Sequence, residues 1–106
     1  MGTRLRNLEE TLGADRVITA QEFKDYGVLS FDPAGARNVD LPVVTTVIGE
    51  SILIVNRADA AEDITLRLTA GGATQATISR DEACLVWCTG SATPFYGSLL
   101  LKVGVT

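Results

Sequence analysis

Short runs in which apolar and polar side chains alternate constrain this chain more than any other feature. Residues 64–69 alternate cleanly, and residues 37–41 do the same. About eight such runs follow one another from Val17 onward, each ended by turn residues such as the glycine pair at 71–72. A period of two is typical of half-buried strands, so the sequence predicts an all-β fold.

The spacing of these runs favours antiparallel pairing. No segment between them is long enough for the helical crossover that parallel neighbours in one sheet usually need. Regular spacing with short turns is typical of a β-sandwich or barrel, and a jelly-roll topology fits it. We therefore expect an antiparallel, jelly-roll-like β-sandwich domain over residues 17–106. Residues 18–22 and 43–47 could each hold a helical turn instead of a strand.

The predicted core consists of apolar positions that recur with period two in separate runs. The chain has 106 residues, of which 46% are hydrophobic, and this suits one domain with a substantial core. The predicted core residues are Leu29, Phe31, Val39, Leu41, Ile52, Ile54, Ile64, Leu66, Leu68, Leu99, Leu101 and Val103.

Residues 1–16 differ from the rest of the chain and predict a short N-terminal helical arm. Leucines recur there at helical spacing, between a threonine that can cap the helix and a glycine that can end it. A helix this short is not stable alone in water, so it must pack on its own sheet or on another protein. The residues assigned to partner contact are Arg4, Leu5, Arg6, Leu8, Leu12 and Arg16.

Two predicted strands, residues 52–55 and 84–87, are apolar on both faces. A strand that is apolar on both faces is usually buried on both, but a two-layer sandwich buries only one face of each sheet. Loops or the N-terminal arm could cover the second face. The alternative is a subunit interface in a symmetric oligomer, which favours aromatic and apolar anchors. The interface residues would be Leu53, Val55, Leu85 and Trp87.

The two cysteines, Cys84 and Cys88, lie in one apolar run that reads as a buried strand. Four residues of a strand span about 13 Å, whereas a disulfide needs Cα atoms within about 7 Å of each other. We therefore expect two free, buried thiols. Unpaired thiols fit assembly in a reducing cytoplasm.

The sequence excludes several classes of chemistry. The chain has no histidine, so it holds no Ser-His-Asp or Cys-His nucleophile and no histidine-liganded metal. Its net charge of −4 argues against a nucleic-acid partner. No apolar run approaches the roughly 20 residues of a membrane helix, and the first residues do not resemble a secretory signal. Neighbouring carboxylates point to opposite faces of a strand, so we expect no catalytic site, no enzyme activity and no cofactor.

Two sets of residues are weaker candidates for ligand binding. Asp59 and the carboxylate pair at 62–63 could gather around a Ca²⁺ ion, but their spacing matches no EF-hand loop, and we expect no metal. Trp87, Phe95 and Tyr96 could form a platform on which a sugar stacks. With so few aromatic residues in the chain, packing in the core or in an interface is the favoured alternative.

Three stretches resemble small β-domains of tailed-bacteriophage virions, namely capsid decoration (cement) proteins and appendage domains. These stretches are VLSFD at 28–32, NVDLP at 38–42 and GESILIVN at 49–56. A strand that ends in Leu-Pro precedes a glycine-led apolar strand that ends in Asn, and an ITL strand and a glycine-rich turn follow. The resemblance covers roughly residues 27–103 and concerns strands and turns, with no catalytic signature.

The resemblance implies a trimeric β-sandwich or jelly roll that sits on the outer surface of a capsid and stabilises the shell. The implied partner is the major capsid protein, and the N-terminal arm would touch the shell. The implied location is the virion exterior, after assembly in the host cytoplasm. The alternative is a receptor- or glycan-binding domain of a tail fibre or spike. The chain has no collagen-like or coiled-coil stalk, which favours the decoration protein.

Overall fold

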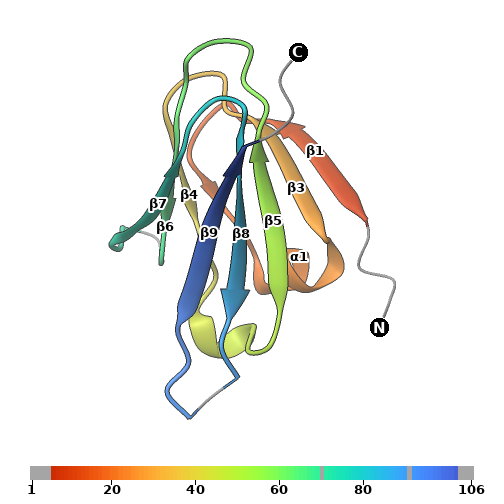
Figure 1. Cartoon of the computed structure of the whole chain (residues 1–106), viewed down its shortest axis with the longest axis vertical. Coiled ribbons are helices and arrows are strands. Elements are labelled where there is room, and N and C mark those ends of the chain that lie inside the picture. The colour runs from red at the N-terminus through yellow and green to blue at the C-terminus, as the bar shows by residue number, and fades with distance from the viewer. Residues whose placement is uncertain (1–5, 70, 91, 103–106) are drawn as a thin grey trace.

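The computed structural model describes residues 6–69, 71–90 and 92–102 and shows two packed β-sheets (Figure 1). The five-stranded sheet has the strand order β1-β3-β5-β8-β9, and the four-stranded sheet has the order β2-β4-β6-β7. Strands dominate, as the alternating runs predicted. The elements are β1 (Asn7–Thr11), β2 (Arg16–Val17), α1 (Ala20–Asp25), β3 (Val28–Asp32), β4 (Arg37–Asp40), the 3-10 turn η1 (Val44–Thr46), β5 (Ser51–Asn56), β6 (Ile64–Arg67), β7 (Thr74–Ile78), β8 (Glu82–Cys88) and β9 (Tyr96–Lys102).

The first six strands alternate between the two sheets, and this makes four strand pairs parallel. β1 pairs with β3 and β3 with β5 in one sheet, while β2 pairs with β4 and β4 with β6 in the other. The pairs β5–β8, β6–β7 and β8–β9 are antiparallel. The expectation of antiparallel pairing throughout is therefore wrong, and a jelly-roll topology is not confirmed. Each return to the same sheet passes through a strand of the other sheet, so parallel neighbours need no long helical crossover.

Residues 7–11 form the edge strand β1, so the helix expected there is wrong. β1 runs parallel to β3, and just beyond it the Leu12 N–H donates to the Asp32 carbonyl over 2.8 Å. Leu8 and Leu12 are four residues apart, which places them on one face of a strand as well as of a helix. The strand forms because it adds a row of backbone hydrogen bonds to the edge of the sheet and buries Leu12 in the core. Residues 1–5 lie outside the described residues.

The core lies between the two sheets and contains most of the predicted residues. Of these, Leu29, Phe31, Val39, Leu41, Ile52, Ile54, Ile64 and Leu66 are buried, and Leu68 packs against them. The prediction of a core position is wrong for Leu99 and Leu101. The inward positions of β9 begin with Tyr96, so both leucines lie on the opposite face of the sheet. Val103 lies outside the described residues.

The short helix α1 carries the chain from β2 to β3. Thr19 and Glu22 form a reciprocal capping box, in which each side chain accepts a hydrogen bond from the other residue's backbone N–H. Phe23 is buried in the core and holds the helix against the sheets. The helical turns considered at 18–22 and 43–47 are both present. The first, α1, begins two residues and ends three residues later than those bounds, and η1 lies within one residue of them.

Candidate functional site

The outer face of the five-stranded sheet points away from the second sheet and carries a group of apolar side chains. The strand register places Leu53 opposite Leu85 and Leu85 opposite Leu99, so these three leucines form a row across β5, β8 and β9. Rows on either side of it share the same face because side chains alternate along each strand. We call this surface the outer apolar patch; its members are Leu53, Val55, Leu85, Trp87, Leu99 and Leu101.

The four residues predicted as an oligomer interface therefore lie together in the outer apolar patch. Their sequence neighbours Ile52, Ile54, Cys84 and Val86 point the other way and are buried. Both strands are thus apolar on both faces. The described part of the chain buries one of these faces fully and leaves the other half-buried at Leu53, Val55 and Leu85. Leu99 and Leu101, predicted from their spacing to lie in the core, belong instead to the patch, with exposed fractions of 53% and 41%.

Trp87 forms the end of the outer apolar patch and covers a glycine on the neighbouring strand. Gly97 lies opposite Trp87, and a Cβ atom added to it would come within 2.4 Å of the indole ring. The ring therefore lies against the sheet in space that only a glycine leaves open. Trp87 keeps 39% of its surface exposed, so the indole is still available to a partner.

The rest of the outer face is mostly polar, and this gives the patch a clear border. β1 presents Asn7, Glu9 and Thr11 on this face, all exposed. β3 follows with Ser30 and Asp32, which share the face through the parallel register. A partner that avoids water would therefore contact the β5–β8–β9 half of the sheet and leave the β1–β3 half in solvent.

The residues predicted as a shell-contacting arm are not brought together on one exposed surface. Arg4 and Leu5 lie outside the described residues. Leu12 is buried in the core, and Leu8 is half-buried against it. Arg6 is exposed. The Arg6 guanidinium lies 5.0 Å from the ring centre of Tyr26, so every described side chain of this set contacts another part of the same chain.

Arg16, the last residue of the predicted arm, belongs to an ion-pair network at the β1 end of the fold. Its guanidinium lies 3.0 Å from the Glu10 carboxylate and 2.7 Å from the Glu22 carboxylate. Hydrogen bonds from Arg16 hold the pKa of the Glu22 carboxyl below its usual value, and the two carboxylates raise the pKa of Arg16. The guanidinium also lies 5.8 Å from the ring centre of Phe31. Arg16 is therefore committed to intramolecular contacts.

Cys84 and Cys88 are free and buried, as the strand spacing predicted. Both point from β8 toward the core, because they are four residues apart on one strand. Burial raises the pKa of each thiol. A raised pKa keeps a thiol protonated at neutral pH, so neither cysteine has the features of an activated nucleophile.

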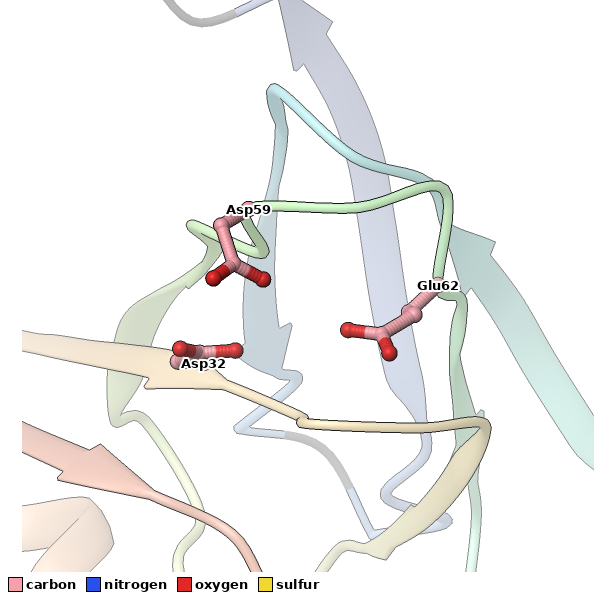
Figure 2. Close-up of side chains that lie close together, drawn as sticks. All are labelled: Asp32, Asp59 and Glu62. Atoms are coloured by element: carbon pink, nitrogen blue, oxygen red, sulfur yellow. The ribbon is translucent and has the colours of Figure 1, made fainter.

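Three carboxylates gather where β3 and the loop after β5 meet (Figure 2). One oxygen each of Asp32, Asp59 and Glu62 lies within 4.8 Å of the others. Glu62 Oε1 is buried and accepts no hydrogen bond, while Asp32 Oδ1 accepts one from the Ala34 N–H. Oxygen ligands of this kind suit a hard cation such as Ca²⁺. The sequence indicated Asp59, Glu62 and Asp63 as candidate Ca²⁺ ligands. The structure replaces Asp63 with Asp32, which is distant in sequence and is brought close only by the fold.

The fold separates Tyr96 from the other two aromatic residues considered as a sugar platform. Trp87 and Phe95 are exposed, the latter by 61%. Tyr96 is buried, packs against Phe23 with ring centres 6.1 Å apart, and donates its hydroxyl hydrogen bond to the Pro42 carbonyl. Tyr96 is therefore a core residue and no part of a platform. The described residues enclose no pocket.

The comparisons do not identify a relative. No protein-family model, no curated protein and no solved structure matches the chain. Within the described ranges, no helix is long and apolar enough to cross a membrane.

Proposed function

We propose that the chain is a non-enzymatic structural protein of a tailed-bacteriophage virion. It binds the major capsid protein on the outside of the shell and stabilises the assembled particle, after assembly in the host cytoplasm. The resemblance of residues 28–56 to small virion β-domains suggests this role. The outer apolar patch is the observation that carries it, because a surface of this kind has to be covered.

The patch supports docking for an energetic reason. Exposed apolar patches on soluble proteins mark interaction sites when they are contiguous and bordered by polar residues. Burying apolar surface contributes about 25 cal/mol per Å² removed from water. Leu85 lies at the centre of the patch, between Leu53 and Leu99, and is the natural anchor. Repetition of a modest contact over a lattice multiplies its effect, and binding to the assembled shell stabilises that state.

Co-sedimentation with empty shells tests the proposal. The shells are assembled from the major capsid protein encoded in the same genome, and the labelled chain is added at increasing concentration. The variant Leu85→Lys should bind at least tenfold more weakly than the unchanged protein, because the patch cannot bury an unpaired charge. Val43→Lys is the matched control, since Val43 is 56% exposed and lies outside the patch.

Two outcomes contradict the proposal. If the unchanged protein does not sediment with the shells, the capsid is not its partner. If Leu85→Lys binds as well as Val43→Lys, the outer apolar patch is not the contact surface. Circular dichroism of both variants verifies that they keep the β-rich fold.

The homotrimer implied by the resemblance remains a prediction. The arm of residues 1–16 was expected to grip the shell, but Leu12 and Arg16 are engaged in the fold. We therefore assign the main shell contact to the outer apolar patch. The solution mass of the protein, measured by light scattering, tests the trimer directly.

Trp87 favours a second candidate function, a glycan- or receptor-binding domain of a tail fibre or spike. The indole lies over Gly97 with an exposed face, and flat aromatic faces can stack on sugar rings. Tryptophan fluorescence during titration with host-surface glycans tests this candidate. A saturable change that Trp87→Ala abolishes supports it, and no change across a glycan panel counts against it.

A further inference from the structure

β9 is an edge strand that lacks the features by which proteins usually protect an edge. It ends the five-stranded sheet and, among the described residues, pairs with β8 alone (Figure 1). Natural edges are short, or are interrupted by proline, charge or a bulge. β9 has seven residues in continuous register with β8 and contains no proline. Its one charged side chain, Lys102, lies at its end and bonds Glu82.

The run of leucines in β9 is apolar on both faces of the sheet, whereas Ser98, on the inner face, accepts a hydrogen bond from Gln75 of β7 over 2.7 Å. Leu99 and Leu101 belong to the outer apolar patch, and Leu100 points the opposite way yet remains 46% exposed. Three consecutive exposed leucines on an edge strand are unusual, because such an edge invites pairing with another strand. The edge therefore specifies the chemistry of its partner: an extended strand with apolar residues on both sides.

The opposite edge of the same sheet is protected. β1 points Glu10 inward, where it meets Arg16 and, through it, Glu22. Inward-pointing charges discourage further strands from pairing at an edge. Glu9 adds a charge on the outer face of the same strand. The five-stranded sheet is therefore protected at its β1 edge and unprotected at its β9 edge.

The hydrogen-bonding direction of each β9 residue follows from the register. The Thr89 N–H donates to the Phe95 carbonyl over 3.0 Å, so Phe95 faces β8. Backbone groups alternate in direction along a strand. Leu99 therefore also faces β8, whereas Tyr96, Ser98, Leu100 and Lys102 direct their N–H and C=O groups away from the sheet. These four residues are the unpaired row of the edge.

We infer that β9 pairs with β9 of a second copy of this chain, antiparallel and with the two Leu100 residues opposite each other. This register lets Ser98, Leu100 and Lys102 bond, because Ser98 then lies opposite Lys102 of the second copy. Only Tyr96, which is buried at the start of the strand, stays outside the pairing. No two like charges lie opposite each other in this register. It also places Leu99 beside Leu101 of the second copy, which joins the two outer apolar patches into one surface. The contact is two-fold symmetric and therefore closed.

The size of the contact determines its strength. A standard stable interface buries about 800 Å² on each partner, and a single strand pair is smaller. The pair is therefore a weak dimer whose population depends on concentration. The inference does not depend on binding to a shell, but it competes with the homotrimer that the resemblance implies, and the mass of the protein in solution distinguishes the two.

Cysteine cross-linking tests the register. In Leu100→Cys the two new thiols lie opposite each other, and hydrogen-bonded opposite residues have Cα atoms about 5.5 Å apart, within disulfide range. Mild oxidation should therefore give a covalent dimer. Ser98→Cys is the matched control, because its counterpart in the second copy is a lysine and no symmetric bridge can form. Both variants also carry Cys84→Ala, because Cys84 of β8 lies directly opposite residue 100 and contacts the side chain of residue 98, where it could bridge the new thiol within one copy. Equal cross-linking of the two variants, or none, overturns the register.

Sedimentation velocity over a range of concentrations tests the pairing itself. The unchanged protein should shift from monomer to dimer as its concentration rises. Leu100→Pro should weaken dimerisation at least tenfold, because proline removes the outward-facing N–H at the centre of the pairing and leaves the hydrogen bonds to β8 intact. Val43→Lys should dimerise normally. A trimer, or a monomer up to about 1 mM, overturns the inference. Hydrogen exchange on the unchanged protein gives a readout without mutation: the Leu100 amide should gain protection with concentration, and the Leu99 amide should be protected throughout.

Discussion

Gly97 and Trp87 show how one missing side chain shapes the outer surface. The indole occupies the space directly above the glycine, where a Cβ would approach within 2.4 Å. The ring covers backbone that would otherwise be open to solvent, a role that aromatic residues often take beside a glycine in a sheet. The shape of the outer apolar patch therefore depends on a residue with no side chain.

Gly97→Ala should displace the indole of Trp87 toward solvent. The added methyl group conflicts with the ring, and the ring can move because it lies at the surface. We expect a red shift in tryptophan emission and a loss of stability of about 1 kcal/mol, the usual size for a single substitution. Gly90→Ala is the control, since its Cβ would meet only an ordinary contact at 3.7 Å. An unchanged emission maximum in Gly97→Ala would contradict the geometry.

Leu66 is fully buried between the sheets, so Leu66→Ala should lower the free energy of unfolding by about 2–5 kcal/mol. The loss combines transfer of apolar surface with the cavity that remains. Chemical denaturation measures it. Val43→Ala, at an exposed position, should stay within about 0.5 kcal/mol of the unchanged protein. A loss below about 1 kcal/mol for Leu66→Ala would show that the site collapses around the smaller residue.

The sequence predicted core residues where apolar and polar positions alternate and failed where they do not. Leu66 lies between threonine and arginine, which leaves one orientation for the strand. The run Leu99–Leu100–Leu101 has apolar residues at both odd and even positions. The alternation therefore cannot show which of these leucines points toward the core. The buried Tyr96 fixes the orientation of β9, because its hydroxyl donates a hydrogen bond to the Pro42 carbonyl. These two residues are 54 positions apart in the sequence, so local alternation cannot reveal the contact.

Among the elements, the N-terminal segment illustrates the limit of local reasoning. Leucines four residues apart satisfy both a helix and a strand, and the choice depends on β3, which offers an edge to pair with. α1 differs, since its capping box lies entirely within residues 19–22 and gives a local reason for the helix. Local signals located the helical turns, whereas pairing between distant segments created β1.

The network at the start of α1 predicts a pH dependence of stability. The pKa of Glu22 is lowered from its usual 4.5 by Arg16. A carboxyl with a lowered pKa in the folded state contributes stability above its unfolded pKa, and this contribution disappears as pH falls through the folded pKa. Glu22→Gln should therefore lower the melting temperature at pH 7, by the equivalent of up to about 1 kcal/mol for a partly exposed pair.

The difference between Glu22→Gln and the unchanged protein should shrink as the pH falls below 4.5. Thermal denaturation at pH values from 7 down to 3 measures it. Gln retains the capping hydrogen bond, so the comparison isolates the charge. Glu9→Gln, on the exposed outer face, is the control and should show no such trend. A difference that is constant with pH would mean that Arg16 does not act through the Glu22 charge.

At the scale of the whole molecule, the sequence predicted two layers of strands but not the order in which they pair. Turn residues mark where a strand ends, yet they carry no information about which sheet the next strand joins. The same limit applies to the carboxylate cluster, where Asp32 joins Asp59 and Glu62 only through the packing of β3 beside β5. The two-sided strands 52–55 and 84–87 were recognisable because their composition alone marks an uncovered face.

Deletion of residues 1–16 should destabilise the whole domain. It removes β1, the core residue Leu12 and the partner of Glu22, and it exposes the edge of β3. We expect a lower melting temperature and aggregation. Leu12→Asp should reproduce much of the loss because it buries an unpaired charge. Gly13→Asp, at an exposed position where an added Cβ meets nothing within 4 Å, should not. A deletion variant that melts like the full chain would show that β1 contributes little.

The alternation of strands between sheets also sets the order in which the chain can fold during synthesis. None of β1 to β5 pairs with the strand that follows it in sequence, and the first such pair is β6–β7. Non-local pairing is slow because a long loop must close before any contact is made. The N-terminal half, which leaves the ribosome first, therefore has no hairpin to start from. Its strands pair with one another only across the other sheet, so we expect the two sheets to form together rather than one hairpin at a time.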